Sequence, residues 1–214
     1  MFIGHIAVGF AAKGAAPKAS LGVLIGAASF LDLLWPVFLL LGWEHVRIEP
    51  GNTAFTPLAF DSYPFSHSLL AVLGWSALCG SLYWVIRRDR RGAGIVVALV
   101  VSHWLLDALS HRPDLPLTLA GSARVGLGLW NSVPATFLVE GTMFAAGIWL
   151  YATFTRAKDG IGRWAFALYV ATLCLLYLAS AFGPPPPNWR TLAWSGLVAI
   201  LLAIWPAGFD RHRA

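Results

Sequence analysis

A histidine and an aspartate, His103 and Asp107, stand four residues apart in the apolar segment 101–111. On a helix this spacing places the two side chains on one face, and His111 continues the same row. An imidazole and a carboxylate arranged in this way can ligate one metal ion, as the two histidines of a helical H-E-x-x-H pair do. Such ligands suit Zn²⁺, or Mn²⁺ and Fe²⁺ if further oxygens join. The alternative is a hydrogen-bonded pair that only holds helices together.

Further ionisable side chains interrupt other apolar segments of the chain. They are His5, Asp32, His67 and Glu140. A charged group at bilayer depth costs about 2.5–3.5 kcal/mol on insertion scales, so each of them needs a partner. A carboxylate between Leu31 and Leu33 would be protonated unless a cation or a donor meets it, and Glu140 raises the same question. His67 follows Pro64 at an expected helix start, where Ser66 or Ser62 is available as a cap, and it could also simply meet the headgroups.

The composition of the chain is that of a membrane protein. Hydrophobic residues make up 58% of it and charged residues only 12%, whereas a soluble domain carries about 25% charged residues. The net charge of +5 comes from short basic clusters between apolar runs, as orientation signals do, so no nucleic-acid partner is expected. Cys79 and Cys174 each stand alone, which predicts neither a disulfide nor a thiolate metal site.

Apolar segments of membrane-spanning length recur along the chain. A bilayer core of about 30 Å needs roughly 20 apolar residues per helix. Segments that meet this length lie at about 20–42, 66–86, 93–111, 132–154 and 162–182, and a slightly shorter one lies at about 191–207. The opening segment 2–12 is too short to span and is expected to be a half-helix, a re-entrant piece or a packed N-terminal helix. The sequence therefore predicts an all-α polytopic membrane helix bundle, with about six long transmembrane helices plus a short N-terminal helix in a single domain, 1–214.

The basic clusters predict an orientation in the membrane. They lie at 13–18, 87–91, 156–163 and 211–213. If six helices alternate in direction, all of these clusters fall on one side, which the positive-inside rule assigns to the cytoplasm. The opposite loops, 43–65, 112–131 and 183–190, carry few basic residues. This pattern predicts a multi-pass membrane protein with a cytoplasmic C-terminus, and in a bacterium the opposite loops would face the periplasm.

The same topology brings the buried polar residues to a similar depth. His67 starts its helix at the outer side, and Asp107 and His111 approach that side from the other direction. Asp32 and His103 lie at mid-depth, and Glu140 is about eight residues from the outer face. We therefore expect these side chains to meet in the outer half of the bilayer, whereas His45 and His212 fall in a loop and in the tail and are expected to be solvated.

Several short motifs occur in a fixed order along the chain. They are Gly4-His5-Ile6-Ala7, Leu31-Asp32, Tyr63-Pro64-Phe65-Ser66-His67-Ser68-Leu69 and Ser102-His103-Trp104-Leu105-Leu106-Asp107. In this combination the chain resembles the bacterial inner-membrane metal-dependent hydrolases of the YdjM-like group over nearly its whole length. The resemblance implies a multi-helix membrane fold and a divalent-metal site built from His5, Asp32, His67, His103 and Asp107.

The chain also departs from the pattern of that group. Wider members often show Pro-Asp-x-Asp, whereas here Leu31 precedes Asp32 and Leu34 takes the second acidic position. Ser62 and Tyr63 stand where a His-Arg pair is common. One metal ion is therefore expected rather than two.

Two functional classes remain open beside a third, structural one. In the first, a membrane hydrolase, a zinc-like ion is held by His67, His103 and Asp107, with His5 or Asp32 completing the ligands. A bound water then has its pKa lowered to about 7, and Glu140, Asp32 or His111 serves as general base. The depth of the site suggests a lipid or lipid-linked substrate that enters sideways from the bilayer.

The second class is a small ion- or proton-coupled transporter or permease that uses the same His, Asp and Glu cluster, since such residues also mark ion pathways. The sequence contains no inverted repeat of the kind that many transporters show. The third class is a non-catalytic assembly protein whose polar residues only pack helices. Nothing in the sequence indicates an oligomeric state.

Overall fold

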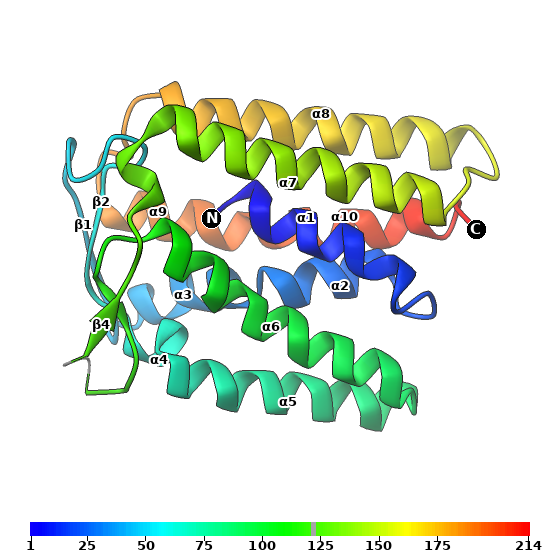
Figure 1. Cartoon of the computed structure of the whole chain (residues 1–214), viewed down its shortest axis with the longest axis horizontal. Helices are drawn as coiled ribbons and strands as arrows, with labels where there is room; N and C mark the ends of the chain where they lie inside the picture. The colour runs from blue at the N-terminus through cyan, green and yellow to red at the C-terminus, as the bar shows by residue number, and fades with distance from the viewer. Residues whose placement is uncertain (121–122) are drawn as a thin grey trace.

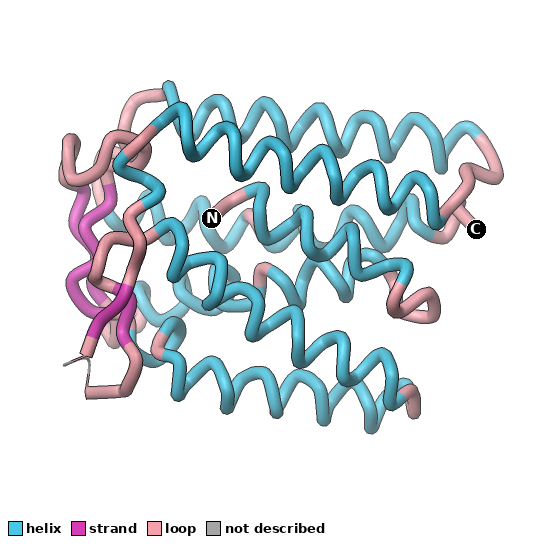
Figure 2. Tube along the Cα trace, in the orientation of Figure 1, coloured by secondary structure: helices cyan, strands magenta, loops and turns pink. Residues whose placement is uncertain are grey.

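The computed structural model describes residues 1–120 and 123–214, so the outer loop 112–131 is described without its residues 121–122. Its elements form a helical bundle, and the predicted all-α class is confirmed (Figures 1 and 2). Within the described chain, five helical spans are long and apolar enough to cross a membrane. Four are single helices: α5 (Leu69–Arg87), α6 (Arg90–Ser110), α7 (Val133–Phe154) and α8 (Gly160–Phe182). The fifth, Trp189–Asp210, is made of α9 (Trp189–Val198) and α10 (Ile200–Asp210). A bent pair, α2 (Leu21–Ala28) and α3 (Phe30–Leu40), forms a sixth if it counts as one span.

The short opening segment is a packed N-terminal helix, α1 (Ile3–Ala11), followed by a 3₁₀ turn, η1 (Ala12–Gly14). It packs against α2, α6 and α7 in the middle of the bundle, and the N-terminus lies well inside the length of the bundle (Figure 1). Its side chains are largely buried, including Ile3, Ile6 and Phe10. Because α1 begins at this depth, its first N–H groups need partners from the protein.

The first expected long helix, 20–42, is not continuous, and this is a correction to the sequence prediction. It breaks at Ser29, where α2 and α3 meet at a bend of 58°. Because α2 ends at Ala28, the carbonyl of that residue is a helix-end acceptor without a backbone partner in the helix. The break therefore provides an acceptor in the interior of the bundle, where a continuous helix would have none.

The second expected helix, 66–86, begins differently from the prediction. A single turn, α4 (Pro64–His67), precedes α5, and Pro64 occupies its first turn as expected. Ser68 is extended between the two, and its side chain accepts the N–H of Ala71. The cap of the long helix is therefore Ser68 rather than Ser66 or Ser62, which leaves Ser66 free for another contact.

Two small antiparallel hairpins, which the sequence analysis did not predict, close one end of the bundle (Figures 1 and 2). Strand β1 (His45–Ile48) pairs with β2 (Leu58–Ser62), with Val46 opposite Phe60, and β3 (Leu115–Pro116) pairs with β4 (Arg124–Val125). A second 3₁₀ turn, η2 (Leu129–Asn131), leads into α7. The loops expected on the outer side thus form a folded cover.

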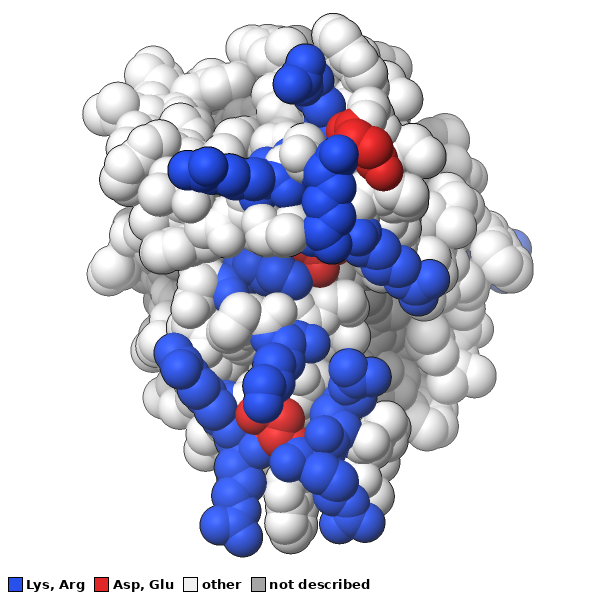
Figure 3. Space-filling view, turned by 90° about the vertical axis from the view of Figure 1, so that its right-hand side faces the viewer, with Lys and Arg blue, Asp and Glu red and all other residues white. Residues whose placement is uncertain are grey.

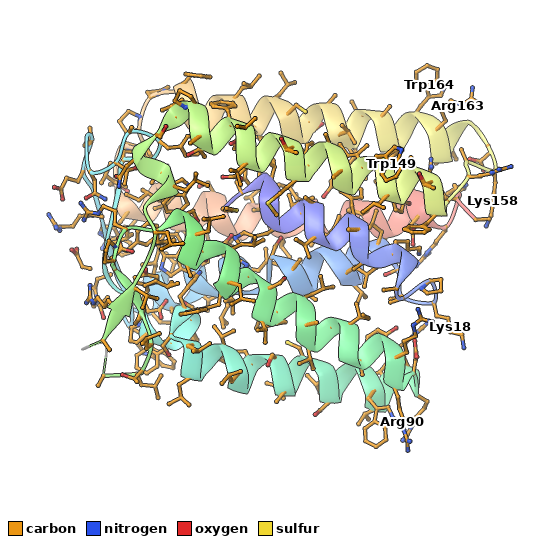
Figure 4. The ribbon with its side chains drawn as sticks, in the orientation of Figure 1. Lys18, Arg90, Trp149, Lys158, Arg163 and Trp164 are labelled. Carbon is orange, nitrogen blue, oxygen red and sulfur yellow. The ribbon has the colours of Figure 1, made fainter. Side chains whose placement is uncertain are left out.

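The opposite end of the bundle is basic. Figure 3 views this end, where the Lys and Arg side chains gather. Lys18, Arg90, Lys158 and Arg163 lie there together with Trp149 and Trp164 (Figure 4).

A buried carboxylate, Asp210, joins the helices near the basic end. It accepts hydrogen bonds from Lys13 Nζ (2.6 Å), Tyr151 Oη (2.8 Å) and Leu21 N (3.0 Å). These contacts tie α10 to α7, to the start of α2 and to the turn after α1. The far end of α1 is thereby fixed, and its other end is held in the bundle interior.

We expect Gly147→Ala to destabilise the protein, because a Cβ there would lie 2.5 Å from the Ala7 oxygen and 2.9 Å from its Cα, both on α1. Overpacking of this kind costs about 1–3 kcal/mol. The matched control is Gly141→Ala on the same helix, where a Cβ meets nothing within 4 Å. Thermal unfolding in detergent should show a lower midpoint for the first variant only. Equal midpoints for both variants would show that α1 does not pack this closely on α7.

Candidate metal centre

Side chains from four helices meet in the half of the bundle that the hairpins cover. They are His5 of α1, Asp32 of α3, His67 of α4, and His103 and Asp107 of α6. Their ligand atoms form two overlapping groups with metal-compatible spacing, one of His5, His103 and Asp107 and one of Asp32, His67 and His103. All of the residues predicted as metal ligands are therefore neighbours in space.

The tightest part of this cluster is formed by Asp32, His67, His103 and Asp107. His67 Nε2 lies 3.7 Å from Asp32 Oδ1 and 3.7 Å from Asp107 Oδ2. His103 Nε2 lies 3.7 Å from Asp32 Oδ1 and 3.1 Å from Asp107 Oδ2. Ligands on a tetrahedral ion with bonds of about 2.0–2.1 Å are roughly 3.3–3.4 Å apart. The four nitrogen–oxygen distances are equal to this value or slightly longer or shorter, and the two metal-compatible groups share His103. We call Asp32, His67, His103 and Asp107 together the four-ligand set.

The orientation of His103 is fixed by the break between α2 and α3. Its Nδ1 lies 2.8 Å from the Ala28 carbonyl oxygen. A carbonyl only accepts hydrogen bonds, so Nδ1 carries a hydrogen, and in the neutral imidazole Nε2 carries the lone pair. Nε2 is buried and has no hydrogen-bond partner in the described chain. A fixed imidazole with an unused buried lone pair beside two carboxylates is the arrangement that metal ligands adopt.

The orientation of His67 is fixed by a chain of hydrogen bonds that ends at Glu44. The Ser66 hydroxyl donates to Glu44 Oε2 at 2.6 Å, and the Ser66 N–H donates to Glu44 Oε1 at 2.7 Å. The Ser66 oxygen also lies 2.7 Å from His67 Nδ1. Because the hydroxyl hydrogen is already used, the imidazole donates from Nδ1 and directs the Nε2 lone pair to the four-ligand set.

His5 contacts the other oxygen of Asp107. Its Nε2 lies 3.1 Å from Asp107 Oδ1, and its ring stacks on that of His103 with centroids 3.6 Å apart. The amino group of Met1 lies 2.7 Å from the same oxygen and 3.1 Å from His5 Nε2. One oxygen of Asp107 thus faces His5 and a cationic amine, while the other faces His67 and His103.

Glu140, predicted as a catalytic base, caps α1. Its Oε2 accepts the N–H groups of Phe2 at 3.0 Å and of Gly4 at 3.2 Å. These are orphan donors at a helix N-terminus, where a carboxylate is also favoured by the helix dipole. The buried position of Glu140 therefore has a structural cause, and its role as a base stays a prediction.

His111 lies just beyond the end of α6, in an extended conformation (φ −65°, ψ 152°). The helical row expected from the spacing therefore ends at Asp107. His111 Nδ1 lies 2.9 Å from Asp114 Oδ1, to which Tyr63 Oη also donates at 3.1 Å. Burial raises the pKa of Tyr63 well above its ordinary value, so the phenol remains a neutral donor. The carboxylate only accepts, so His111 donates from Nδ1, and its Nε2 makes no hydrogen bond within the described chain.

A cavity of about 180 Å³ adjoins the four-ligand set. Asp32, His67, Asp107 and His111 all line it, and aromatic rings such as Trp35 and Trp130 form other walls. The Asp32 side chain is 47% exposed, whereas that of Asp107 is only 3% exposed, so Asp32 is the carboxylate that opens to this space. A small molecule in the cavity would therefore contact both the candidate ligands and His111.

Several residues of this site were not singled out by sequence reasoning. Glu44 and Asp114 lie in segments read as loops, and Tyr63 was noted as part of a motif and as a departure from a family pattern, with no role at the site. Glu44 reaches Ser66 across 22 residues of chain, and no spacing rule links them. The hairpin pairing of β1 with β2 brings them together, and that hairpin was itself missed.

We expect Glu140→Ala to lower the stability of the fold, because two N–H groups of α1 would lose their acceptor in the bundle interior. Leaving buried donors unpaired costs about 1–3 kcal/mol each. Glu140→Gln keeps an acceptor oxygen and should cost less. Thr142→Ala, on the exposed face of the same helix, is the control. If thermal unfolding showed Glu140→Ala to be as stable as the native chain, the cap would not be the reason for this residue.

Comparisons with protein families, with curated proteins and with solved structures find no match for this chain. The case for its function therefore rests on the geometry of the site and on the sequence motifs that supply it.

Proposed function

We propose that this chain is a membrane-embedded metal-dependent hydrolase that belongs with the YdjM-like proteins its motifs resemble. One divalent ion, zinc before manganese or iron, would be bound by Asp32, His67, His103 and Asp107. The observation that carries the proposal is the four-ligand set, with nitrogen and oxygen atoms 3.1–3.7 Å apart and an unpartnered buried nitrogen on His103.

The balance of charge supports a bound cation. Among the described residues, the groups within ion-pair distance of Asp32 are the imidazoles of His67 and His103. Both imidazoles donate from Nδ1 and present lone pairs, so in this form they are neutral ligands rather than cations. Asp32 opens to the cavity and has no cation beside it in this form, so a divalent ion bound there would balance its charge. Two imidazole nitrogens and two carboxylate oxygens are ligands that suit Zn²⁺, and a water molecule would join them as a further ligand.

The residues around the ion fit a hydrolytic reaction. A divalent ion bound here would lower the pKa of a water molecule to about 7 and polarise the bond to be cleaved. His111, held by Asp114, is the general base: its Nε2 takes a proton from the attacking water. The water oxygen bonds to the carbonyl carbon or phosphorus, the ester or amide bond breaks, and His111 returns the proton to the leaving group. Such proton transfer contributes typically 10²–10⁴-fold in rate.

The position of the site supports a lipid or lipid-linked substrate. The cavity lies inside a bundle whose outer surface is apolar, and Trp35, Phe60 and Trp130 provide aromatic walls. The hydrolysable group would be an ester, an amide or a phosphoester that enters from the side of the bilayer. The hairpins cover the same end, and their loop residues Phe55, Thr56 and Leu58 line the cavity.

We also propose that the basic end faces the cytoplasm of a bacterial inner membrane, which places the C-terminus there and the site in the outer half of the bilayer. The gathering of Lys and Arg at one end supports this orientation (Figures 3 and 4). In a chain without Cys79 and Cys174, an impermeant maleimide should label Thr118→Cys but not Lys158→Cys in intact spheroplasts. Labelling of Lys158→Cys alone would show the reverse orientation.

We expect one metal ion per chain in the purified protein, and its loss in His103→Ala and Asp107→Asn. His111→Ala should keep the metal, because that residue is proposed as a base and not as a ligand. His45→Ala, at an exposed histidine of the hairpin, is the matched control. Elemental analysis of the detergent-purified variants gives the stoichiometry. If His103→Ala and Asp107→Asn contained as much metal as the native protein, the four-ligand set would not be the binding site.

The hydrolytic step has a separate readout. Zinc-loaded protein incubated with mixed membrane lipids should release cleaved products detectable by mass spectrometry, and His111→Ala should reduce the rate by about 10²–10⁴-fold with its metal retained. Metal binding without hydrolysis, together with metal-ion uptake into liposomes, would favour a transporter instead.

A further inference from the structure

A second cavity, of about 370 Å³, adjoins the first. It lies between the loop that joins β1 to β2, the end of α8 and the proline turn that follows α8. The two cavities share wall residues, namely Phe55, Thr56, Leu58 and Ser180. They are therefore neighbouring spaces with a common partition, and together they extend from the four-ligand set to the start of α9.

The second cavity is lined by uncharged residues, many of them apolar. Its lining, within the described residues, contains no charged side chain. The Thr53 hydroxyl donates to the Thr56 carbonyl at 3.0 Å and accepts the Thr56 N–H at 2.9 Å, and Ser180 Oγ donates to the Tyr177 carbonyl at 2.8 Å. Because these hydroxyl hydrogens are used within their own turn or helix, a polar ligand would lose hydration here without new partners. A hydrocarbon would gain from leaving water.

The end of α8 connects this cavity with the lipid phase. Leu178 and Phe182 on that helix end are 45% and 71% exposed, as expected for a face that meets the bilayer. The same helix end contributes small residues to the cavity lining, among them Ala179 and Ala181. A hydrocarbon chain that passes this helix end would therefore meet small side chains between the exposed apolar residues and the cavity.

We propose, on the basis of the proposed hydrolase function, that the second cavity binds the hydrocarbon chain of the lipid substrate while the hydrolysable group lies at the four-ligand set. The chain would pass the partition between Phe55 on the hairpin loop and Ser180 on α8. The shared walls carry this assignment, because a ligand that reaches from one cavity to the other must be apolar at one end and able to approach a metal at the other. The substrate class is therefore a lipid with at least one extended, uncharged hydrocarbon chain.

The test uses a metal-binding head group with tails of different length. Acetohydroxamate and octanohydroxamate are titrated into the Co²⁺-loaded full chain in lipid nanodiscs, and binding is read from the visible absorption of the cobalt. Each buried methylene raises affinity about three- to fourfold, so octanohydroxamate should bind native protein at least tenfold more tightly. Ala179→Trp, which fills the second cavity alone, should reduce this ratio at least tenfold and leave acetohydroxamate affinity unchanged. Leu178→Trp, on the lipid face one residue earlier, is the matched control and should keep the native ratio.

Ala54→Trp fills the same cavity from the opposite wall and replaces Ala179→Trp if that variant does not fold. Loss of the tail-length preference in either cavity variant, with the control unchanged, supports the proposal. A native ratio in the folded cavity variants overturns it while the metal site stands. If the native chain binds no cobalt, or if neither hydroxamate perturbs its spectrum, the proposed hydrolase function fails, and this inference fails with it.

Discussion

The arrangement of this bundle depends on the cost of keeping two carboxylates, Asp32 and Asp107, among apolar helices. In such surroundings an anion is stable only beside a cation or several donors. Asp107 uses one oxygen for His5 and the Met1 amine and turns the other toward His67 and His103. Asp32 faces the same two imidazoles. Both imidazoles donate their hydrogen elsewhere, so the carboxylates converge on lone pairs, and a metal ion would satisfy all four groups together.

Interrupted helices make this convergence possible. The end of α2 supplies the Ala28 carbonyl that orients His103, and the single turn of α4 before α5 carries Ser66 and His67. The start of α1 lies inside the bundle, where Glu140 accepts its first N–H groups. A set of uninterrupted spanning helices would leave none of these backbone or hydroxyl groups available. The irregular positions are tolerated because protein, and not lipid, surrounds them.

Apolar length was sufficient to predict the bundle and an opening segment too short to span, for which a packed helix was one of three possibilities. Loop charges predicted that the buried polar residues share a depth, and the family resemblance added His5 to the candidate ligands. His103 and Asp107 could be paired from their four-residue spacing. The free-energy cost of placing Asp32 and Glu140 in apolar segments indicated that both residues have partners. Hydropathy does not register a one-residue break, so the bend at Ser29 and the extended Ser68 were missed. The contacts of Glu44 and Asp114 were also missed, because they depend on two short hairpins and on chain reversals that no local period specifies. The energetic cost of burying Glu140 indicated that it has partners but not that it is catalytic, since its partners are backbone groups of α1.

The most direct test of the central claim is X-ray absorption spectroscopy of the zinc-loaded chain. The four-ligand set predicts a shell of nitrogen and oxygen ligands at about 2.0–2.1 Å, with imidazole outer-shell scattering from two histidines and no sulfur. His45→Ala should leave this imidazole scattering unchanged. A shell of oxygen ligands alone, or a shell that contains sulfur, would contradict the account.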